Sequence, residues 1–179
     1  MGTLPEESAH GSCGSFGLAA PTVTTADRIA DAALRRHARV GIAESLTCGL
    51  LASELGKGHD AAEWFAGGVV AYQTDVKQHV LKVRAGVDPC SAECAEQLAT
   101  GVRTLLDADL AVSATGVGGP DAEDGHAPGT VYLGWSSGVD VGHRLLRLAG
   151  DPAEILTQTV DCCLDLLEQL LAGQTGAAD

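Results

Sequence analysis

The sequence predicts an α/β fold, a three-layer sandwich in which helices on both faces cover an open, mostly parallel mixed sheet. Apolar residues at helical spacing alternate along the chain with short, almost wholly apolar runs, the pattern of strands buried between helices. Aromatic residues make up only 3% of the 179 residues, so the core must consist of Ala, Val, Leu and Ile, which suits thin, tightly packed layers. The 45% hydrophobic and 20% charged content is that of an ordinary globular protein.

The length corresponds to a single domain. Residues 1–22 are rich in Gly, Ser, Ala and Pro without periodicity and predict a disordered leader, and residues 174–179 predict a flexible tail. The folded domain is therefore expected over residues 23–173. No apolar run approaches the roughly 18 residues of a membrane-spanning helix, and no basic segment followed by an apolar one marks a secretory signal. We expect a cytoplasmic protein.

The sequence of the first half of the domain predicts two helices, each followed by a strand. In order, these are a helix from Thr24 or Thr25 to about residue 39, a strand over residues 40–43, a helical stretch after Ser45 and Thr47 that ends at Gly56, and a buried strand over residues 64–72. A threonine before an apolar stripe is a common N-cap, and glycine commonly ends a helix. Gly67 and Gly68 indicate a bulge or a close backbone approach within the second strand.

The second half continues the alternation and closes with a hairpin. It predicts a helix opening at Thr74 and Asp75, a helix over about residues 92–106, a strand over residues 109–115, strands over about residues 130–136 and 139–148, and a helix over residues 152–171. Pro89 and Ser91 introduce the second of these helices, and Pro152 suits the first turn of the last. The turn near Gly138 makes the last two strands antiparallel.

Polar residues follow the ends of three strands. Ser45 comes after the first strand, Tyr72 after the second and Thr115 at the end of the third. Open α/β sheets bind ligands outside the carboxyl ends of their strands. We therefore expect the functional site at this edge of the sheet.

Ser45 stands where a strand gives way to a helix. Backbone amides of a first helical turn can stabilise an oxyanion beside its hydroxyl. The alternative is that Ser45 or Thr47 is only an N-cap, the commonest task of such residues before a helix.

Lys77 is more informative, because a cation in a first turn opposes the helix dipole by about 0.3–1 kcal/mol. The same dipole and partial burial would lower its pKa and make the neutral amine available as a base. The Tyr72 phenol and Lys77 could converge on Ser45, since a nucleophile needs an adjacent base rather than a histidine in particular. The alternative is a solvated lysine and an interfacial tyrosine.

The segment TGVGGPDAEDGHAPG after the third strand is a glycine-rich, acidic loop. It lacks the Lys-Ser/Thr of a P-loop, but it can bring bare backbone amides to a small anion. Asp121, Glu123, Asp124 and His126 are expected to form a solvated stretch rather than a metal site.

The six cysteines are expected to be free thiols. Adjacent Cys162 and Cys163 and the length of the chain argue against a disulfide framework. Cys90 and Cys94 with a histidine lack the short paired spacing of structural zinc. We expect no metal and no cofactor.

The charge balance excludes two classes of partner. Eleven Lys and Arg against 24 Asp and Glu residues give a formal net charge of −13. A phosphate polymer or an anionic membrane calls for the opposite sign. We expect neither nucleic acid nor a membrane as a partner.

Four motifs, AESLTCGLLASEL, FAGGVVAYQTDVK, ADLAVSATGVGGP and PGTVYLGW, occur in this order, and together they resemble the CinA C-terminal domain family over about residues 26–171. Stand-alone members of that family are nicotinamide-nucleotide amidohydrolases. The resemblance implies hydrolysis of the carboxamide of nicotinamide mononucleotide, a small-molecule pyridine nucleotide, to nicotinic acid mononucleotide and ammonia, without metal. It also implies a homo-oligomer, most simply a homodimer.

By position, Ser45 is similar to the family's nucleophile, and Tyr72 and Lys77 are similar to the residues that activate it. The implied substrate-binding residues are Thr47, Cys48, Gly49, Thr115, Gly116, Gly118 and Gly119.

The chain departs from the family pattern at two places. Cys48 replaces the first glycine of the usual A-E-S-x-T-G-G, and we expect its side chain to line the pocket beside Ser45. Pro152 and Leu156 stand where the family tends to carry arginines, which leaves Arg144 and Arg147 as substitutes for binding phosphate. The missing arginines favour a changed substrate, or the alternative of a CinA-like module that binds a nucleotide or a partner protein without turnover.

Overall fold

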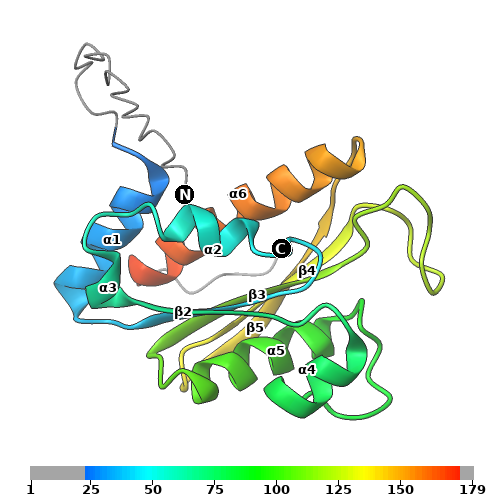
Figure 1. Cartoon of the computed structure of the whole chain (residues 1–179), viewed down its shortest axis with the longest axis horizontal. Coiled ribbons are helices and arrows are strands. Elements are labelled where there is room, and N and C mark those ends of the chain that lie inside the picture. Colours follow the sequence, from blue (N-terminus) through cyan, green and yellow to red (C-terminus); the bar gives the residue numbers. More distant parts are fainter. Residues whose placement is uncertain (1–22, 174–179) are drawn as a thin grey trace, which may run out of the picture.

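A computed structural model describes residues 23–173 of the chain (Figure 1), so the predicted leader and tail lie outside the described residues. The elements are, in order, α1 (Thr25–Arg36), β1 (Val40–Glu44), α2 (Leu50–Leu55), α3 (Ala61–Trp64), β2 (Phe65–Val70), α4 (Thr74–Leu81), α5 (Ala92–Leu105), β3 (Leu110–Gly116), β4 (Thr130–Ser136), β5 (Val141–Arg147) and α6 (Pro152–Leu171).

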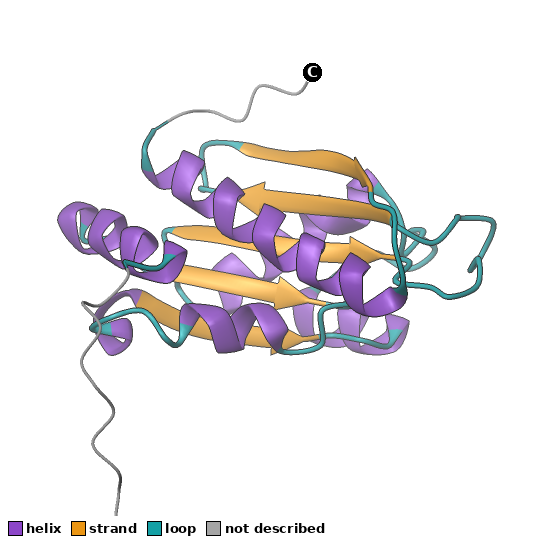
Figure 2. Ribbon diagram, turned by 90° about the horizontal axis from the view of Figure 1, so that it is seen from above, coloured by secondary structure: helices purple, strands orange, loops and turns teal. Residues whose placement is uncertain are grey.

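The strands form one five-stranded sheet in the order β2-β1-β3-β4-β5. β1 pairs in parallel with β2 and with β3, whereas β4 is antiparallel to both of its neighbours, β3 and β5. Four strands therefore point the same way, and only the β4 arrow is reversed in Figure 2. The predicted mostly parallel mixed sheet with a terminal hairpin is confirmed.

Helices cover both faces of this sheet. Figure 1 shows α1, α2 and α6 on one face and α4 and α5 on the other. The larger core lies under α1 and α6 and includes Ile29, Leu133 and Leu166, and the smaller one lies under α5 and includes Leu98 and Ala111. Alternate residues of a strand point to opposite faces, so β1 and β3 contribute to both cores. The predicted three-layer sandwich follows.

Three helix starts match the sequence analysis. The Thr24 side chain accepts a hydrogen bond from the Asp27 N–H, Ser91 caps α5 through the Cys94 N–H, and Pro152 stands at the start of α6. At these positions the capping signal is local and acts within one turn, so the sequence is sufficient to place the helix start.

Other boundaries differ from the prediction. α1 ends at Arg36 rather than near residue 39, because His37 adopts a left-handed backbone with φ 52° and its N–H returns to carbonyls of the last turn. Trp64 belongs to α3, a short helix that the sequence analysis did not predict. β2 is correspondingly shorter, and it is a partly exposed edge strand rather than a buried one.

The predicted irregularity at the glycines of β2 is confirmed. The register between β1 and β2 shifts after Val40, which pairs with Phe65 while Gly41 pairs with Gly67. A Cβ at Gly68 would lie 2.7 Å from Ile42 Cγ1, so only glycine allows the two strands to approach this closely.

Among the described helices, none combines the length and the apolar character needed to cross a lipid bilayer.

Candidate active site

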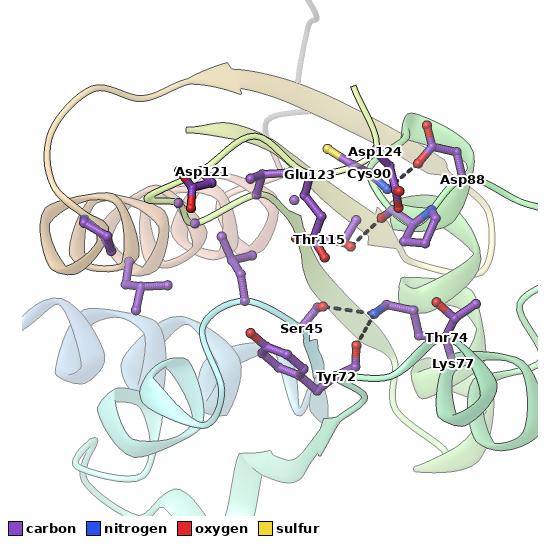
Figure 3. A pocket seen from close by; sticks show the side chains of 18 residues that line it. Ser45, Tyr72, Thr74, Lys77, Asp88, Cys90, Thr115, Asp121, Glu123 and Asp124 are labelled. Atoms are coloured by element: carbon purple, nitrogen blue, oxygen red, sulfur yellow. Dashed lines mark hydrogen bonds between the residues drawn. The ribbon is translucent and has the colours of Figure 1, made fainter. Parts of the chain in front are cut away.

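A pocket of about 260 Å³ opens at the carboxyl ends of β1 and β3, the edge that the sequence analysis indicated. Figure 3 shows its lining side chains, which come from the turn after β1, the segment around α4, residues 88–90, the loop after β3 and the first turns of α6. The pocket contains Ser45, Tyr72, Lys77, Thr115, Gly116, Gly118 and Gly119. Seven of the ten site residues predicted from the sequence are thus brought together.

Ser45 lies in the turn directly after β1, where its N–H donates to the Ala114 carbonyl at 3.1 Å. It is 8% exposed. Neither Ser45 nor Thr47 caps α2, because the N-cap is Gly49, with φ 100° and no side-chain hydrogen bond. The alternative interpretation of Ser45 and Thr47 as N-caps is therefore wrong.

Lys77 is buried beside Ser45 rather than solvated, with only 3% of its surface exposed. Its Nζ donates to Ser45 Oγ at 3.0 Å and to the Tyr72 carbonyl oxygen at 2.8 Å. Burial lowers the pKa of the Lys77 ammonium, against the opposing influence of Cys94 and Glu123. A lysine with a lowered pKa is a base placed to take the serine proton.

Tyr72 contributes its main chain to this pair. Its carbonyl holds Lys77 Nζ, while among the described residues its phenol forms no hydrogen bond with Ser45 or Lys77. The residue is 66% exposed, and its ring lies at the mouth of the pocket beside Ser45 (Figure 3). The expected convergence of phenol and ammonium on Ser45 is not seen in this structure.

Glu44, which the sequence analysis missed, holds the start of α2. Its carboxylate is 1% exposed and accepts hydrogen bonds from the N–H groups of Gly49, Leu51 and Ala52 at 3.0–3.1 Å. A carboxylate at a helix N-terminus satisfies unpaired donors and complements the dipole. The available signal was an acidic residue ending an otherwise apolar strand just before a helix.

This arrangement corrects the predicted oxyanion hole. At the start of α2, the amides of Gly49, Leu51 and Ala52 are occupied by Glu44 and that of Leu50 by the Thr47 carbonyl, so they cannot bind an oxyanion. Among residues 23–173, the N–H groups of Leu46, Thr47, Gly118 and Gly119 donate to no protein acceptor. Leu46, Gly118 and Gly119 line the pocket, so their unoccupied amides are the candidate donors for a developing oxyanion.

Thr47, Cys48 and Gly49 do not line the pocket. Thr47 is buried with an unpartnered hydroxyl, and the Cys48 side chain is exposed. Cys48 and Gly49 both have left-handed backbones, with φ 49° and 100°, which turn the chain away from Ser45 before α2 begins. The expectation that Cys48 lines the pocket is therefore wrong, since it assumed that the helix starts closer to Ser45.

The loop after β3 forms the opposite wall. The Thr115 hydroxyl donates to the Pro89 carbonyl at 2.6 Å, and a Cβ at Gly116 would collide with the Thr130 carbonyl oxygen. Asp121, Glu123 and Asp124 are exposed, as expected for a solvated stretch, and they also line the open side of the pocket.

The same loop is anchored at His126. His126 exchanges main-chain hydrogen bonds with Glu123, and its Nε2 lies 2.8 Å from Asp88 Oδ2. Burial raises the pKa of Asp88, but the hydrogen bonds from Cys90 and His126 outweigh it and lower the pKa overall. The Asp88–His126 pair thus ties the loop to the pocket wall before α5.

The electrostatic character of the lining is acidic. The exposed residues Asp88, Asp121, Glu123 and Asp124 belong to the lining, and Lys77 is the one cationic side chain among the described lining residues. Burial raises the pKa of the Cys90 thiol, also in the lining, to about 11, so it stays protonated at neutral pH. Within the described part of the chain, no three His, Cys, Asp or Glu side chains are placed to hold a metal ion together.

Neither arginine proposed as a phosphate ligand lines the pocket. Arg147 Nη1 donates to Thr130 Oγ1 at 2.7 Å, and Arg144 Nη2 donates to Gln169 Oε1 at 3.2 Å. Pro152 and Leu156 line it instead, at the positions where the sequence resemblance led us to expect arginines.

Comparisons with known proteins agree on one family. A model described as the CinA C-terminal domain matches residues 22–171. A CinA-like protein of Frankia casuarinae is 37% identical over 144 residues, which is 78% of this chain and 33% of that protein. A Bacillus velezensis protein named among the competence-damage inducible proteins is 47% identical over 102 residues, 55% of this chain. That match covers 24% of the relative, so the chain corresponds to a fraction of these proteins' length.

Solved structures give the same result. A CinA superfamily protein from Klebsiella pneumoniae superimposes with a TM-score of 0.80 at 33% identity, covering 83% of this chain and 96% of that one. Another from Escherichia coli gives a TM-score of 0.79 at 30% identity, covering 82% and 88%.

Proposed function

The chain belongs to the CinA C-terminal domain family, and from this premise and the geometry around Ser45 we propose that it is a serine amidohydrolase that releases ammonia from the carboxamide of a pyridine nucleotide or related amide. Nicotinamide mononucleotide, converted to nicotinic acid mononucleotide, is the compound that the family resemblance implies. The observation that carries the proposal is the 3.0 Å contact between Lys77 Nζ and Ser45 Oγ at the bottom of the pocket.

The first half of the reaction transfers the acyl group to Ser45. The neutral Lys77 amine takes the hydroxyl proton while Ser45 Oγ bonds to the carboxamide carbon. The Tyr72 carbonyl keeps Lys77 Nζ directed at Ser45. Free amides beside the pocket, such as that of Leu46, stabilise the oxyanion. Lys77 then returns the proton to the amide nitrogen, the C–N bond breaks, and ammonia leaves an acyl-serine ester.

The second half consumes one water. Lys77 takes a proton from the water as its oxygen attacks the ester carbon, and it returns the proton to Ser45 Oγ when the ester bond breaks. The acid is released, and the serine and lysine are restored. Carboxamide and water thus become carboxylic acid and ammonia, with no oxidant and no metal in the balance.

The test is ammonia release from nicotinamide mononucleotide, nicotinamide riboside and nicotinamide, with the wild-type protein and the Ser45→Ala variant. We expect Ser45→Ala to abolish turnover, because a covalent mechanism depends on its nucleophile. Ser53→Ala, in α2 and outside the pocket, is the matched control and should retain full activity. Binding of these compounds without any ammonia release would favour the alternative of a binding module.

A further inference from the structure

We propose that the pocket selects a positively charged carboxamide without a phosphate, and that Glu123 is the residue that sets this preference. Applied to pyridine compounds, this predicts a cationic N-ribosyl pyridinium amide as a better substrate than its 5′-phosphate. The inference rests on the proposed function and specifies the substrate class of the same site.

The first support is the charge of the lining. The described lining contains four acidic residues, Asp88, Asp121, Glu123 and Asp124, and one cation, Lys77. Asp88 is paired with His126, whereas the other three carboxylates have no cationic partner among the described residues. Lys77 is engaged with Ser45 and the Tyr72 carbonyl, and as the base it must be uncharged before it reacts. An anionic substrate group therefore meets carboxylates with no free cation to neutralise it. A pyridinium cation meets charges of opposite sign.

The second support is the location of the arginines. Arg144 and Arg147 bind Gln169 and Thr130 and do not line the pocket. Pro152 and Leu156 at the start of α6, which do line it, have apolar side chains. Bidentate side-chain recognition of phosphate is typical of a guanidinium, which this wall does not offer. The remaining donors of the lining are neutral main-chain amides such as those of Gly118 and Gly119.

The third support is the position of Glu123. Its side chain extends from the loop after β3 toward Ser45 and Thr115 (Figure 3). Its charge also acts on Lys77, whose pKa it tends to raise. The main-chain pairing with His126 and the Asp88–His126 contact hold this part of the loop in place. Glu123 is thus the carboxylate placed to interact with a cationic ring whose carboxamide lies at Ser45.

Pocket size agrees with a small substrate. The volume of about 260 Å³ lies just below the roughly 300–1,000 Å³ of pockets for drug-sized ligands. A pyridinium ring also withdraws electrons from its carboxamide, which makes the carbonyl carbon a better target for Ser45.

The experiment compares kcat/KM for ammonia release from nicotinamide riboside and from nicotinamide mononucleotide, which differ only in the phosphate. We expect the wild-type protein to favour the riboside at least tenfold. Glu123→Lys should shift this ratio at least tenfold toward the phosphorylated compound, and Glu123→Gln should shift it less. Glu63→Gln, at an exposed position of α3 and outside the pocket, is the matched control and should leave the ratio unchanged. Added salt should reduce the wild-type preference, because it screens the carboxylates.

Two results would overturn the inference while leaving the proposed function intact, namely a wild-type preference for the phosphorylated compound or a ratio that Glu123→Lys does not change. The proposed function fails separately, if neither compound yields ammonia. In that case calorimetric titration of the same two compounds still decides the charge preference. Tighter binding of the riboside supports the inference, and tighter or equal binding of the phosphate compound, or binding of neither, refutes it.

Discussion

Replacement of Lys77 by Met tests the proposed mechanism directly. Lys77 Nζ is the one side-chain group among the described residues that hydrogen-bonds Ser45 Oγ, so no second base is in place to substitute for it. Loss of general acid–base assistance costs a factor of about 10²–10⁴ in turnover. This corresponds to about 3–5 kcal/mol of transition-state stabilisation.

The fold should survive the substitution. Met fills most of the volume of the lysine stem, and the two lost hydrogen bonds, to Ser45 and to the Tyr72 carbonyl, cost about 1 kcal/mol each. Removal of a buried amine offsets part of that cost. Lys77→Arg should be as inactive as Lys77→Met, because a guanidinium stays protonated at every accessible pH.

The pH dependence gives a second readout of the same group. Burial lowers the Lys77 pKa below its ordinary 10.5, and only the neutral amine can act as a base. The kcat/KM of the wild-type protein should therefore rise with pH and level off above this lowered pKa, at a lower pH than for an ordinary lysine. The ascending limb should be absent from Lys77→Met.

Stability should follow the same titration. Between the folded-state pKa and 10.5, the unfolded chain binds more protons at Lys77 than the folded chain does. The burial penalty is thus full below the folded-state pKa and is relieved as the pH rises toward 10.5. Across this pH interval, the unfolding free energy of the wild-type protein should increase relative to that of Lys77→Met.

The assay is steady-state ammonia release across pH, with circular dichroism and denaturant unfolding to verify the fold. Lys82→Met, at the exposed end of α4 and outside the pocket, is the matched control and should leave the profile unchanged. Lys77→Met retaining more than a tenth of wild-type turnover with its ascending limb intact would refute the assignment of Lys77 as the base.

Four further predictions follow from the described contacts. Glu44→Ala should lower the unfolding free energy by about 3 kcal/mol in denaturant titrations, because three amides, one buried and two part-buried, lose their acceptor. Glu54→Ala, at an ion pair on the surface, should change it by less than about 0.5 kcal/mol, and equal effects would refute the capping role. Cys48→Gly should stabilise the protein by about 1 kcal/mol, because glycine adopts the left-handed backbone of this position without strain. Alkylation of Cys48 should not inactivate the protein, and inactivation that substrate prevents would contradict the location of Cys48 outside the pocket. Tyr72→Phe should reduce turnover less than tenfold, because the phenol holds neither Ser45 nor Lys77, and a loss as large as that of Lys77→Met would restore the phenol as a catalytic group. We also propose a homodimer, for which light scattering at micromolar concentration should give twice the 18.2 kDa of one chain, and the mass of a single chain would count against it.

Local sequence signals were sufficient to predict much of the fold. The predicted bounds of β4 and α6 match the structure, because a short apolar run, an N-cap and a proline at N1 are all signals that act within a few residues. Boundaries were missed where a backbone turn intervened without a strong sequence marker, as at His37 and before α3. A left-handed residue other than glycine leaves little trace in a sequence.

The sequence by itself also determined that Ser45 and Lys77 would face one site, since parallel strands bring their carboxyl ends to the same edge of the sheet. Only the tertiary structure decided which groups surround them. Glu44 accepts hydrogen bonds from amides at the start of α2, and Tyr72 holds Lys77 through its carbonyl rather than its phenol. The loop that bears Glu123 forms part of the pocket wall. Each of these depends on contacts between segments distant in the chain or on the direction in which a backbone group points. Hydrophobic periodicity records which face of an element is buried, but it holds no information about such contacts.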